Sequence, residues 1–486
     1  MVGGALAGIR LEDLSMVFLR YFGRRAVVPA LLGILFVHSA AAQQRLSLDP
    51  SAAVELALRN NLGLEAARIG TGTARRAANL SWNQFIPTVD AGGALLRMNN
   101  EPSLGAMGDL MGAMGLPPPD PIPRWVLAGS LSANLAFNIA MLEDMNRLRM
   151  EYGLGLISYA KARAQLERDV RKLYHNILLL QENIALLLGS LENADRQVQI
   201  AQANFNAGLA PELTLLQAQV ARENLRPVID QAEGGLRLLL MQFAMFLGLP
   251  HDTEFDLEPV AAEMSPLLFD TAELVRRAAA GQPDVRELRQ NILIMNSIRR
   301  SGRQRLFTPT MSVGWNADPV FQGDPMSDRW FGDGADWSQN SGSLTFSVGF
   351  RLNGLLRFGP ERQGLRALED QIRIANIGLA QMIRGTEIEV HNIVLTLDRI
   401  RITMEALEQT VALAERSFAL TEQAYVAGLV DLFQVQNAEQ SLRQARVQLH
   451  EQQFNYLNGL LDLEYALGIP FGTLTSGGGI SAGSPQ

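Results

Sequence analysis

The sequence predicts a mixed α and β fold built by internal duplication, in which two long helical hairpins accompany two pairs of strands. Three observations lead to this prediction. The stretch FNAGLAPELTLLQAQ at 205–219 is matched 220 residues later by YVAGLVDLFQVQNAE at 425–439. A long, regularly spaced apolar seam precedes each copy. Ahead of each seam lies a segment in which apolar and polar residues alternate, as in a strand.

The N-terminal residues are typical of a secretory signal peptide. Several arginines precede the apolar run AVVPALLGILFVHS at 26–39, and three alanines follow it. We therefore assign residues 1–42 to a signal peptide, with Met16 as an alternative start. A membrane anchor is the competing interpretation, but a proline and a glycine interrupt the run, which is shorter than the roughly 20 residues of a spanning helix.

The first repeat, residues 43–265, begins with paired helices. The sequence from Asp49 predicts an Asp-capped amphipathic helix that leads into another helix. FIPTVDAGG then breaks this helix at a proline and starts a strand at 88–98, whose partner is expected at 125–139. The connection between these strands is rich in Gly, Pro and Met and predicts a loop at the cell exterior. Its PPPDPIP is either a stiffening element or a solvated linker.

A long helical hairpin completes the first repeat. From Leu166 to Phe205, apolar residues recur at spacings that alternate between four and three. This pattern predicts a helix packed lengthwise on others, with a seam of roughly 60 Å at about 1.5 Å per residue. Gly208 marks the tip of the hairpin, because glycine accepts the left-handed backbone that ends a helix. The returning helix ends at FLGLP.

The second repeat, residues 266–472, presents the same elements in the same order. It has an Asp-capped helix, a Pro-led strand at 310–316, a second exterior loop at 317–340 and an alternating strand at 343–353. Its hairpin has a tip near Gly428, and the returning helix ends at ALGIP. The Gly- and Ser-rich residues 473–486 predict a disordered tail.

Composition and motifs argue against several functional classes. A net charge of −8, from 42 basic and 50 acidic residues without long runs, gives no basic surface for nucleic acid. The absence of cysteine excludes disulfides, thiolate metal sites and a lipid-modified cysteine. The sequence shows neither a phosphate-binding glycine loop nor a nucleophile elbow. We therefore expect no enzymatic activity and no cofactor.

The remaining titratable residues are interpreted as ordinary surface groups. His175 and His391 are expected on helix surfaces, since the histidines lack the spacing of metal ligands. The acidic pair Glu143 and Asp144, and the pair Glu387 and Glu389, lie adjacent or two apart on predicted helices. Side chains at these spacings do not face one another, so we expect them to be solvated.

The alternating strands distinguish between two classes of protein. Alternation over about ten residues fits membrane strands with lipid on one face and a polar lumen on the other. Because four strands cannot close a barrel, copies of the chain would have to share one. The competing interpretation is a half-buried sheet in a soluble domain. In that case the chain would be a soluble periplasmic coiled-coil scaffold.

The signal peptide, helix pairs, Pro-led strands and AGL-tipped hairpins together resemble the TolC-like outer-membrane efflux protein family. The resemblance runs from Leu46 to about Pro470, and its most specific motifs are the twin tips and the twin helix ends LGLP and LGIP. It implies a homotrimer in the outer membrane of a Gram-negative-type cell. Each protomer would give four strands to one shared transmembrane β-barrel and its helical hairpins to a periplasmic tunnel.

The resemblance also implies a function and partners. The protein would be the passive exit duct of a tripartite efflux system, contacting outer-membrane lipid, a periplasmic adaptor and, through the adaptor, an inner-membrane pump. The outer-membrane component of type I protein secretion shares this fold and is the alternative. The candidate adaptor-docking residues are the two tips: Ala207, Gly208, Leu209, Ala427, Gly428 and Leu429. The competing interpretation is a helix-ending glycine with a packing leucine, which needs no partner.

Family members narrow their tunnel near the tips, often with aspartates. The corresponding positions here, six and nine residues after the second tip glycine, are Gln434 and Asn437, and their first-repeat counterparts are Thr214 and Gln217. These four residues are uncharged, so an aspartate ring is not carried over. Asp431 is a candidate substitute, as is Glu212, although charges at a turn are commonly just solvated.

Overall fold

A computed structural model describes residues 46–99, 105–115, 124–260, 270–323 and 342–474. The chain divides into two compact units, Met1–Leu46 and Ser47–Gln486, and nearly all of the described residues belong to the second. The predicted signal peptide, most of both predicted exterior loops and residues 475–486 lie outside the described part. The PPPDPIP motif lies outside it as well.

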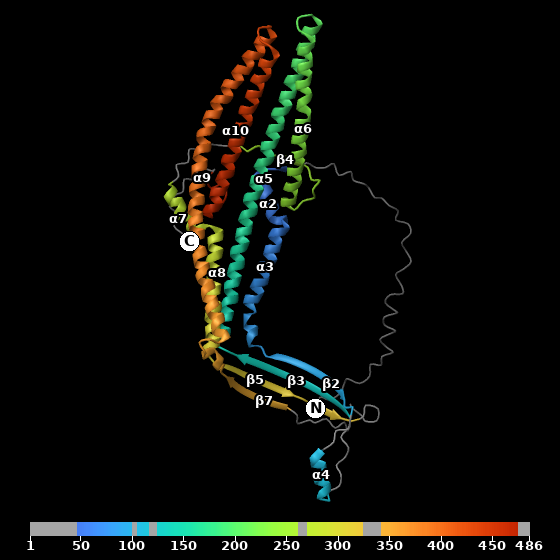
Figure 1. Ribbon diagram of the computed structural model, residues 1–486, viewed down its shortest axis with the longest axis vertical. Coiled ribbons are helices and arrows are strands. Elements are labelled where there is room, and N and C mark those ends of the chain that lie inside the picture. The colour runs from blue at the N-terminus through green and yellow to red at the C-terminus, as the bar shows by residue number, and fades with distance from the viewer. Residues whose placement is uncertain (1–45, 100–104, 116–123, 261–269, 324–341, 475–486) are drawn as a thin grey trace, which may run out of the picture. The chain divides into compact units, whose positions relative to one another are not determined.

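Two long helical hairpins dominate the second unit (Figure 1). The first pairs α5 (Ala140–Asn206) with α6 (Glu212–Leu247), and the second pairs α9 (Pro360–Val426) with α10 (Leu432–Leu467). Both α5 and α9 contain 67 residues, so each spans about 100 Å at 1.5 Å per residue. Both helices are longer than the predicted apolar seams, because each helix begins closer to the sheet than its seam does. The predicted duplication is confirmed.

Shorter helices flank the hairpins and repeat in the same way. The first pair is α2 (Pro50–Asn60) and α3 (Leu62–Asn79), and the second is α7 (Thr271–Gly281) and α8 (Pro283–Phe307). Asp49 caps α2 by accepting a hydrogen bond from an amide of its first turn, and Asp270 caps α7 in the same way. The predicted Asp-capped helices are therefore present in both halves.

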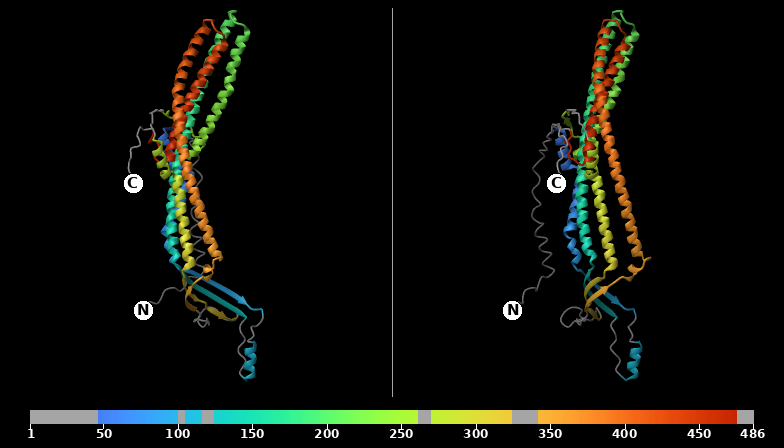
Figure 2. Two further views of the ribbon diagram at one scale, coloured as in Figure 1. Left: turned by 60° about the vertical axis from the view of Figure 1, so that its left-hand side comes forward. Right: turned by 90° about the vertical axis from the view of Figure 1, so that its left-hand side faces the viewer.

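The four main strands form one antiparallel sheet (Figures 1 and 2). This sheet lies at the N-terminal ends of α5 and α9, and the hairpin tips lie at the other ends of these helices. The order is β2-β3-β5-β7, and a short strand, β6, also pairs with β3. The bounds are β2 Thr88–Arg97, β3 Trp125–Phe137, β5 Thr310–Ala317, β6 Val320–Gln322 and β7 Gly342–Gly349.

The strand register aligns the alternating residues across the sheet. Leu135 lies opposite Val313, which in turn lies opposite Phe346, so this row is apolar. The neighbouring row places Ala136 opposite Ser312 and Ser312 opposite Ser347, and the two serine hydroxyls are 2.5 Å apart. Because the side-chain period is two in every strand, the sheet has one mainly apolar face and one mainly polar face.

The last strand is shorter than its sequence pattern predicts. We expected a strand at 343–353, but β7 ends at Gly349 and the chain turns into a 3-10 helix, η2 (Leu352–Leu355). The reason is the neighbouring strand: Gly349 already pairs with Thr310, the first residue of β5, so later residues have no partner on that side. The alternation of apolar and polar residues therefore continues to residue 353, although the strand ends at Gly349.

Several small elements were not predicted. Helix α4 (Gly105–Ala113) lies within the first predicted exterior loop and β6 within the second. Strands β1 (Leu46–Leu48) and β4 (Phe255–Leu257) form a separate two-stranded sheet, and η1 (Ser81–Phe85) is a 3-10 helix that follows α3. Their sequences are too short for a periodic signal.

The core lies along the predicted apolar seams. Val170 and Ile177 on α5, and Val390 and Met404 on α9, are fully buried. The core also reaches past the end of α10. Leu474 is buried and its amide donates a hydrogen bond to the Glu464 carboxylate, with 2.7 Å between the atoms. The disordered tail predicted from residue 473 is therefore wrong for its first two residues.

Candidate functional site

The two hairpin tips have nearly identical backbone geometry. Gly208 and Gly428 both have a φ of +73°. After each glycine a leucine amide, that of Leu209 or Leu429, donates a 2.8 Å hydrogen bond to the carbonyl five residues earlier. The glycine amide itself bonds to the carbonyl three residues earlier. This pair of bonds is the Schellman motif that ends many helices, and it requires the left-handed glycine.

The tip leucines do not pack on their own helices. Leu209 is 78% exposed and Leu429 is 79% exposed. Ala207 and Ala427, which precede the glycines, are exposed too. The competing interpretation is correct that the tip glycine ends the helix. Its expectation that the following leucine packs against the hairpin is wrong, because both leucines are exposed. Each tip therefore presents an apolar side chain to its surroundings.

Further apolar side chains are exposed next to the tips. Leu213 on α6 and Phe433 on α10 occupy the same position in the two repeats, and both are well exposed. Isolated exposed apolar residues are common in proteins, but clusters of them often mark a surface that binds a partner. The four side chains of Leu209, Leu213, Leu429 and Phe433 are called the tip patch below.

Asp431 has a local structural role. Its carboxylate accepts a 3.0 Å hydrogen bond from the amide of Gln434 and so caps the N-terminus of α10. The first repeat has Pro211 at this position, without a side-chain cap. Glu212 lies in the first turn of α6, where a negative charge is favourable to the helix dipole. Asp431 thus has a capping role and Glu212 a favourable place in its helix, whatever either contributes to a constriction.

The uncharged constriction candidates flank a small core between the hairpins. Gln217, Gln434 and Asn437 are exposed and Thr214 is half-buried. Neighbouring residues form a shared apolar cluster that joins α5 and α6 to α9 and α10: Ala201, Leu215, Ala218, Tyr425, Leu432 and Val435. This cluster brings the two hairpins together near their tips and leaves the four candidates outside the core.

A carboxylate that the sequence did not single out also joins the hairpins. Glu439 on α10 accepts hydrogen bonds from Asn193 and Gln197 on α5, at 3.0 and 3.1 Å. Burial raises the pKa of Glu439 above its ordinary value. The aligned residue in the first repeat is Gln219. That acid-for-amide difference within an otherwise matched motif is the signal that could have identified it.

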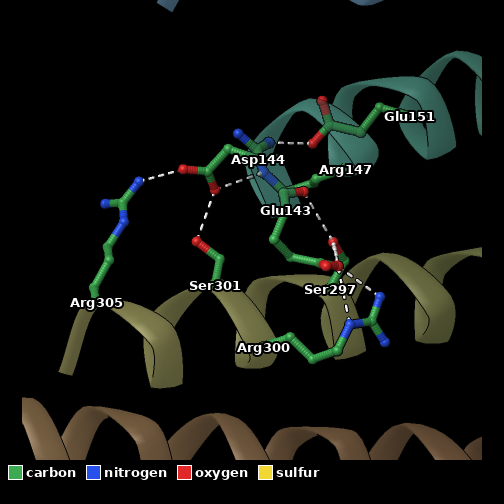
Figure 3. A network of polar contacts seen from close by, with 8 residues as sticks. All are labelled: Glu143, Asp144, Arg147, Glu151, Ser297, Arg300, Ser301 and Arg305. Carbon is green, nitrogen blue, oxygen red and sulfur yellow. Dashed lines mark hydrogen bonds and ion pairs between the residues drawn. The ribbon is translucent and has the colours of Figure 1, made fainter. Parts of the chain in front are cut away.

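Where α5 leaves the sheet, a polar network fastens it to α8 (Figure 3). Glu143 accepts hydrogen bonds from Ser297 and Arg300, both at 2.6 Å to Oε1. One turn of α8 further on, Ser301 donates to Asp144 at 2.8 Å, and Arg305 forms an ion pair with it at 2.5 Å. The expectation that this acidic pair is solvated is wrong, because both acids are buried.

The two acids differ from the expectation because of the facing helix. Helix α8 places serines and arginines opposite consecutive acids, so each carboxylate meets one hydroxyl and one guanidinium (Figure 3). The hydrogen bond from Arg300 lowers the pKa of Glu143 below its ordinary value, although partial burial opposes this. The network therefore favours the ionised form of Glu143 at the junction between sheet and helices. It is called the junction latch below.

The histidines divide between the two environments. His391 is exposed, as predicted. His175 is buried, and its Nδ1 lies 2.9 Å from the side-chain oxygen of Asn458 on α10. Burial lowers the pKa of His175, which favours the neutral ring. The prediction of a surface histidine is wrong here because α10 covers this side of α5.

Within the described part of the chain, no group of three or more His, Asp or Glu side chains is placed to hold a metal ion. Across the same ranges, no helix combines the length and the apolar character needed to cross a membrane.

Comparisons with known proteins agree with this architecture. The described fold is similar to the CmeC outer membrane channel of Campylobacter jejuni, with a TM-score of 0.70 and 16% identity, over 86% of this chain and 85% of that one. It is similar to CusC, with a TM-score of 0.69 and 17% identity, over 87% of this chain and 92% of that one. It is also similar to the outer membrane protein VceC of Vibrio cholerae, with a TM-score of 0.66 and 16% identity, over 87% of this chain and 96% of that one.

The family comparison covers most of the sequence. No curated protein matches the chain. A family model described as outer membrane efflux protein matches residues 53–236 and 274–469, and so includes most of both hairpins and both strand pairs. Its two matched segments correspond to the two repeats. This chain therefore belongs to the outer membrane efflux protein family.

Proposed function

We propose that this outer-membrane protein is the passive exit duct of a tripartite efflux system. The observation that carries the proposal is the aligned sheet: four strands share one apolar and one polar face and continue directly into two helical hairpins. A lipid-facing and a lumen-facing side follow from that division. The helices would extend the duct through the periplasm. Family membership argues against the soluble scaffold that the sequence left open.

The free edges of the protomer support assembly from several copies. Strands β2 and β7 each have a neighbour on one side only within the described sheet. In lipid, unpaired edges leave backbone groups without hydrogen bonds, so we infer that β7 of one copy pairs with β2 of the next in a shared barrel. Ile69 on α3 and Ile374 on α9 are exposed and would be covered by the neighbouring copy. Three copies are what the family resemblance implies.

The tip patch is proposed to dock with a periplasmic adaptor. Its apolar side chains lie on rigid helix ends, and the matching positions of the two repeats give an assembly two similar docking points per protomer. The inner-membrane pump would act through the adaptor and supply the energy. The type I secretion alternative differs in its adaptor and transporter. Capture of a transporter with a polypeptide substrate by crosslinking from the tips would favour it.

The proposal is tested by the conductance of the purified mature protein in planar bilayers, together with its mass in detergent. We expect a trimer that inserts and conducts. A soluble monomer without conductance would refute the duct. The variant L209S/L429S provides a matched control, since it should conduct like the wild type and lose crosslinking to the adaptor. Unchanged crosslinking would show that docking occurs elsewhere.

A further inference from the structure

The duplication contains one marked asymmetry where strand passes into long helix. Helices α5 and α9 begin 220 residues apart and have the same length. In the first repeat two residues, 138–139, connect β3 to α5. In the second repeat ten residues, 350–359, connect β7 to α9. At the 220-residue offset, residues 350–357 correspond to 130–137 of β3, so the second connection is longer because β7 ends earlier than β3. These residues lie outside the sheet only in the second repeat, so their exposed surface is specific to the second connection.

Residues 350–358 of this connection are called the junction segment, which combines exposed apolar and cationic side chains. Leu352 is 66% exposed and Phe358 is 78% exposed. Arg351 and Arg357 are exposed as well, and within the described part of the chain neither guanidinium makes a hydrogen bond or an ion pair. Large apolar side chains beside unpaired guanidinium groups are characteristic of a surface that is covered by an amphipathic partner.

A cavity lies behind the junction segment. It measures about 320 Å³, which is at the lower end of the range for small-molecule sites. Aliphatic side chains and glycines from α8 and α9 form most of its wall, and its charged lining residues are Arg305, Arg351 and Glu361. Arg305 is held by the junction latch, whereas Arg351 is free. The apolar wall suits an acyl chain, while the charged groups are of both signs.

The junction segment is fixed in place. The backbone of Gly354 approaches α8 closely, since an added Cβ would lie 2.9 Å from the side chain of Leu306. Arg362 donates a 3.1 Å hydrogen bond to the Gly354 carbonyl and stacks over the ring of Phe307 at 5.5 Å. The exposure of Leu352 and Phe358 is therefore a property of an ordered turn.

The position of the segment identifies its partner. It continues directly from β7, whose Leu344, Phe346 and Val348 are all exposed on the apolar face of the sheet. If that face contacts lipid, as the proposed function requires, the segment lies where the acyl region meets the headgroups. We propose that the junction segment binds an anionic phospholipid of the leaflet that faces the periplasm. Leu352 and Phe358 would contact its acyl chains, and Arg351 and Arg357 its phosphate.

The chemistry of the two partners is complementary. A guanidinium donates two parallel hydrogen bonds to a phosphate, and its aliphatic stem lies well against acyl chains. Each arginine near an anionic lipid surface strengthens binding by about fivefold. The chain contains no cysteine that could carry a covalent lipid. A bound phospholipid would give the protomer a non-covalent anchor beside its sheet.

The test is a titration of the purified full-length mature protein in detergent with phosphatidylglycerol, with bound lipid counted by native mass spectrometry. We expect R351Q/R357Q to weaken binding about 25-fold, which is fivefold for each arginine. The matched control is R384Q/R416Q, which removes two exposed arginines from the same stretch of chain, on α9. It should bind within about twofold of the wild type.

The other outcomes each contradict the proposal in a distinct way. Equal weakening in both double variants would show a general charge effect. Competition by inorganic phosphate at the concentration of the lipid would show a simple anion site. Loss of the trimer at constant lipid affinity would show that a second copy covers the segment. Conductance is measured separately: a conducting wild type without lipid preference refutes this inference alone, while an inactive soluble monomer refutes the duct.

Discussion

The carboxylate of Glu439 on α10 accepts a hydrogen bond from the side-chain amide of Asn193 on α5, with 3.0 Å between Oε1 and Nδ2. Gln197 donates to the other carboxylate oxygen. Burial is the largest effect on the pKa of this acid and raises it overall, although the two hydrogen bonds and Arg443 on α10 lower it; Glu422 on α9 raises it further. The contact between the two hairpins therefore includes a group that titrates.

The contribution of Glu439 to folding stability should be most favourable in acid, because burial disfavours its charged form. A carboxyl whose pKa is raised on folding holds a proton that the unfolded chain releases above about pH 4.3. Its effect on stability is thus most favourable below that value and is lost as the pH rises through the folded pKa. Denaturant unfolding of Glu439→Gln should show a smaller fall in stability between pH 5 and pH 7 than the wild type. The exposed Glu408→Gln on α9 is the control and should follow the wild type.

Gly428→Val should strain the second tip. With φ at +73° and no heavy atom within 4 Å of an added Cβ, the cost comes from the backbone alone, about 1–3 kcal/mol. We expect reduced export and reduced adaptor crosslinking. Gly428→Asn should be milder, because asparagine tolerates the left-handed region. If valine and asparagine behave like the wild type, the glycine is incidental to docking.

Gln434→Asp tests the constriction. In a trimer with this position lining the tunnel, the change adds a ring of three carboxylates, and divalent cations should then block the single-channel current. Gln434→Asn changes the size of the side chain without adding charge and should leave the current unblocked. A current that divalent cations affect equally in all three proteins would place residue 434 away from the tunnel.

Gly468→Ala should cost more than Gly428→Ala. Both glycines have left-handed backbones, with φ of +65° and +73°. At Gly468, however, an added Cβ would lie 2.4 Å from the Gly281 carbonyl oxygen at the end of α7, whereas space at Gly428 is open. Overpacking adds about 1–3 kcal/mol to the backbone cost. Thermal unfolding of the two variants measures the cost of this close contact. Equal losses of stability in the two variants would contradict the prediction.

The junction latch should weaken below the ordinary pKa of glutamate. The pKa of Glu143 is lowered by Arg300, so its stabilisation is present above about pH 4.3 and is lost as the pH falls through the lower folded value. Glu143→Gln removes the charge that Arg300 and Ser297 contact and should reduce stability by about 1–3 kcal/mol at pH 7. The difference from the wild type should shrink in acid. A constant difference would mean that the charge is unimportant.

Local signals account for most of the architecture that the sequence predicted. Caps at Asp49 and Asp270, left-handed glycines at both tips and the spacing of the apolar seams depend on residues within a few positions of one another. Short stretches of sequence determine these features, and the duplication places the same stretches in both repeats. The family resemblance rested on the same features, and the match of the family to both halves confirms it.

The sequence by itself thus determined the hairpins, the strands and the absence of cysteine chemistry. The tertiary structure decided where β7 ends, because that depends on where β5 begins, and it decided that Glu143 and His175 are buried, because their partners lie more than 100 residues away. It also left the tip leucines exposed. Periodicity fixes which face of a helix is apolar, but burial and ionisation depend on the neighbour that covers that face.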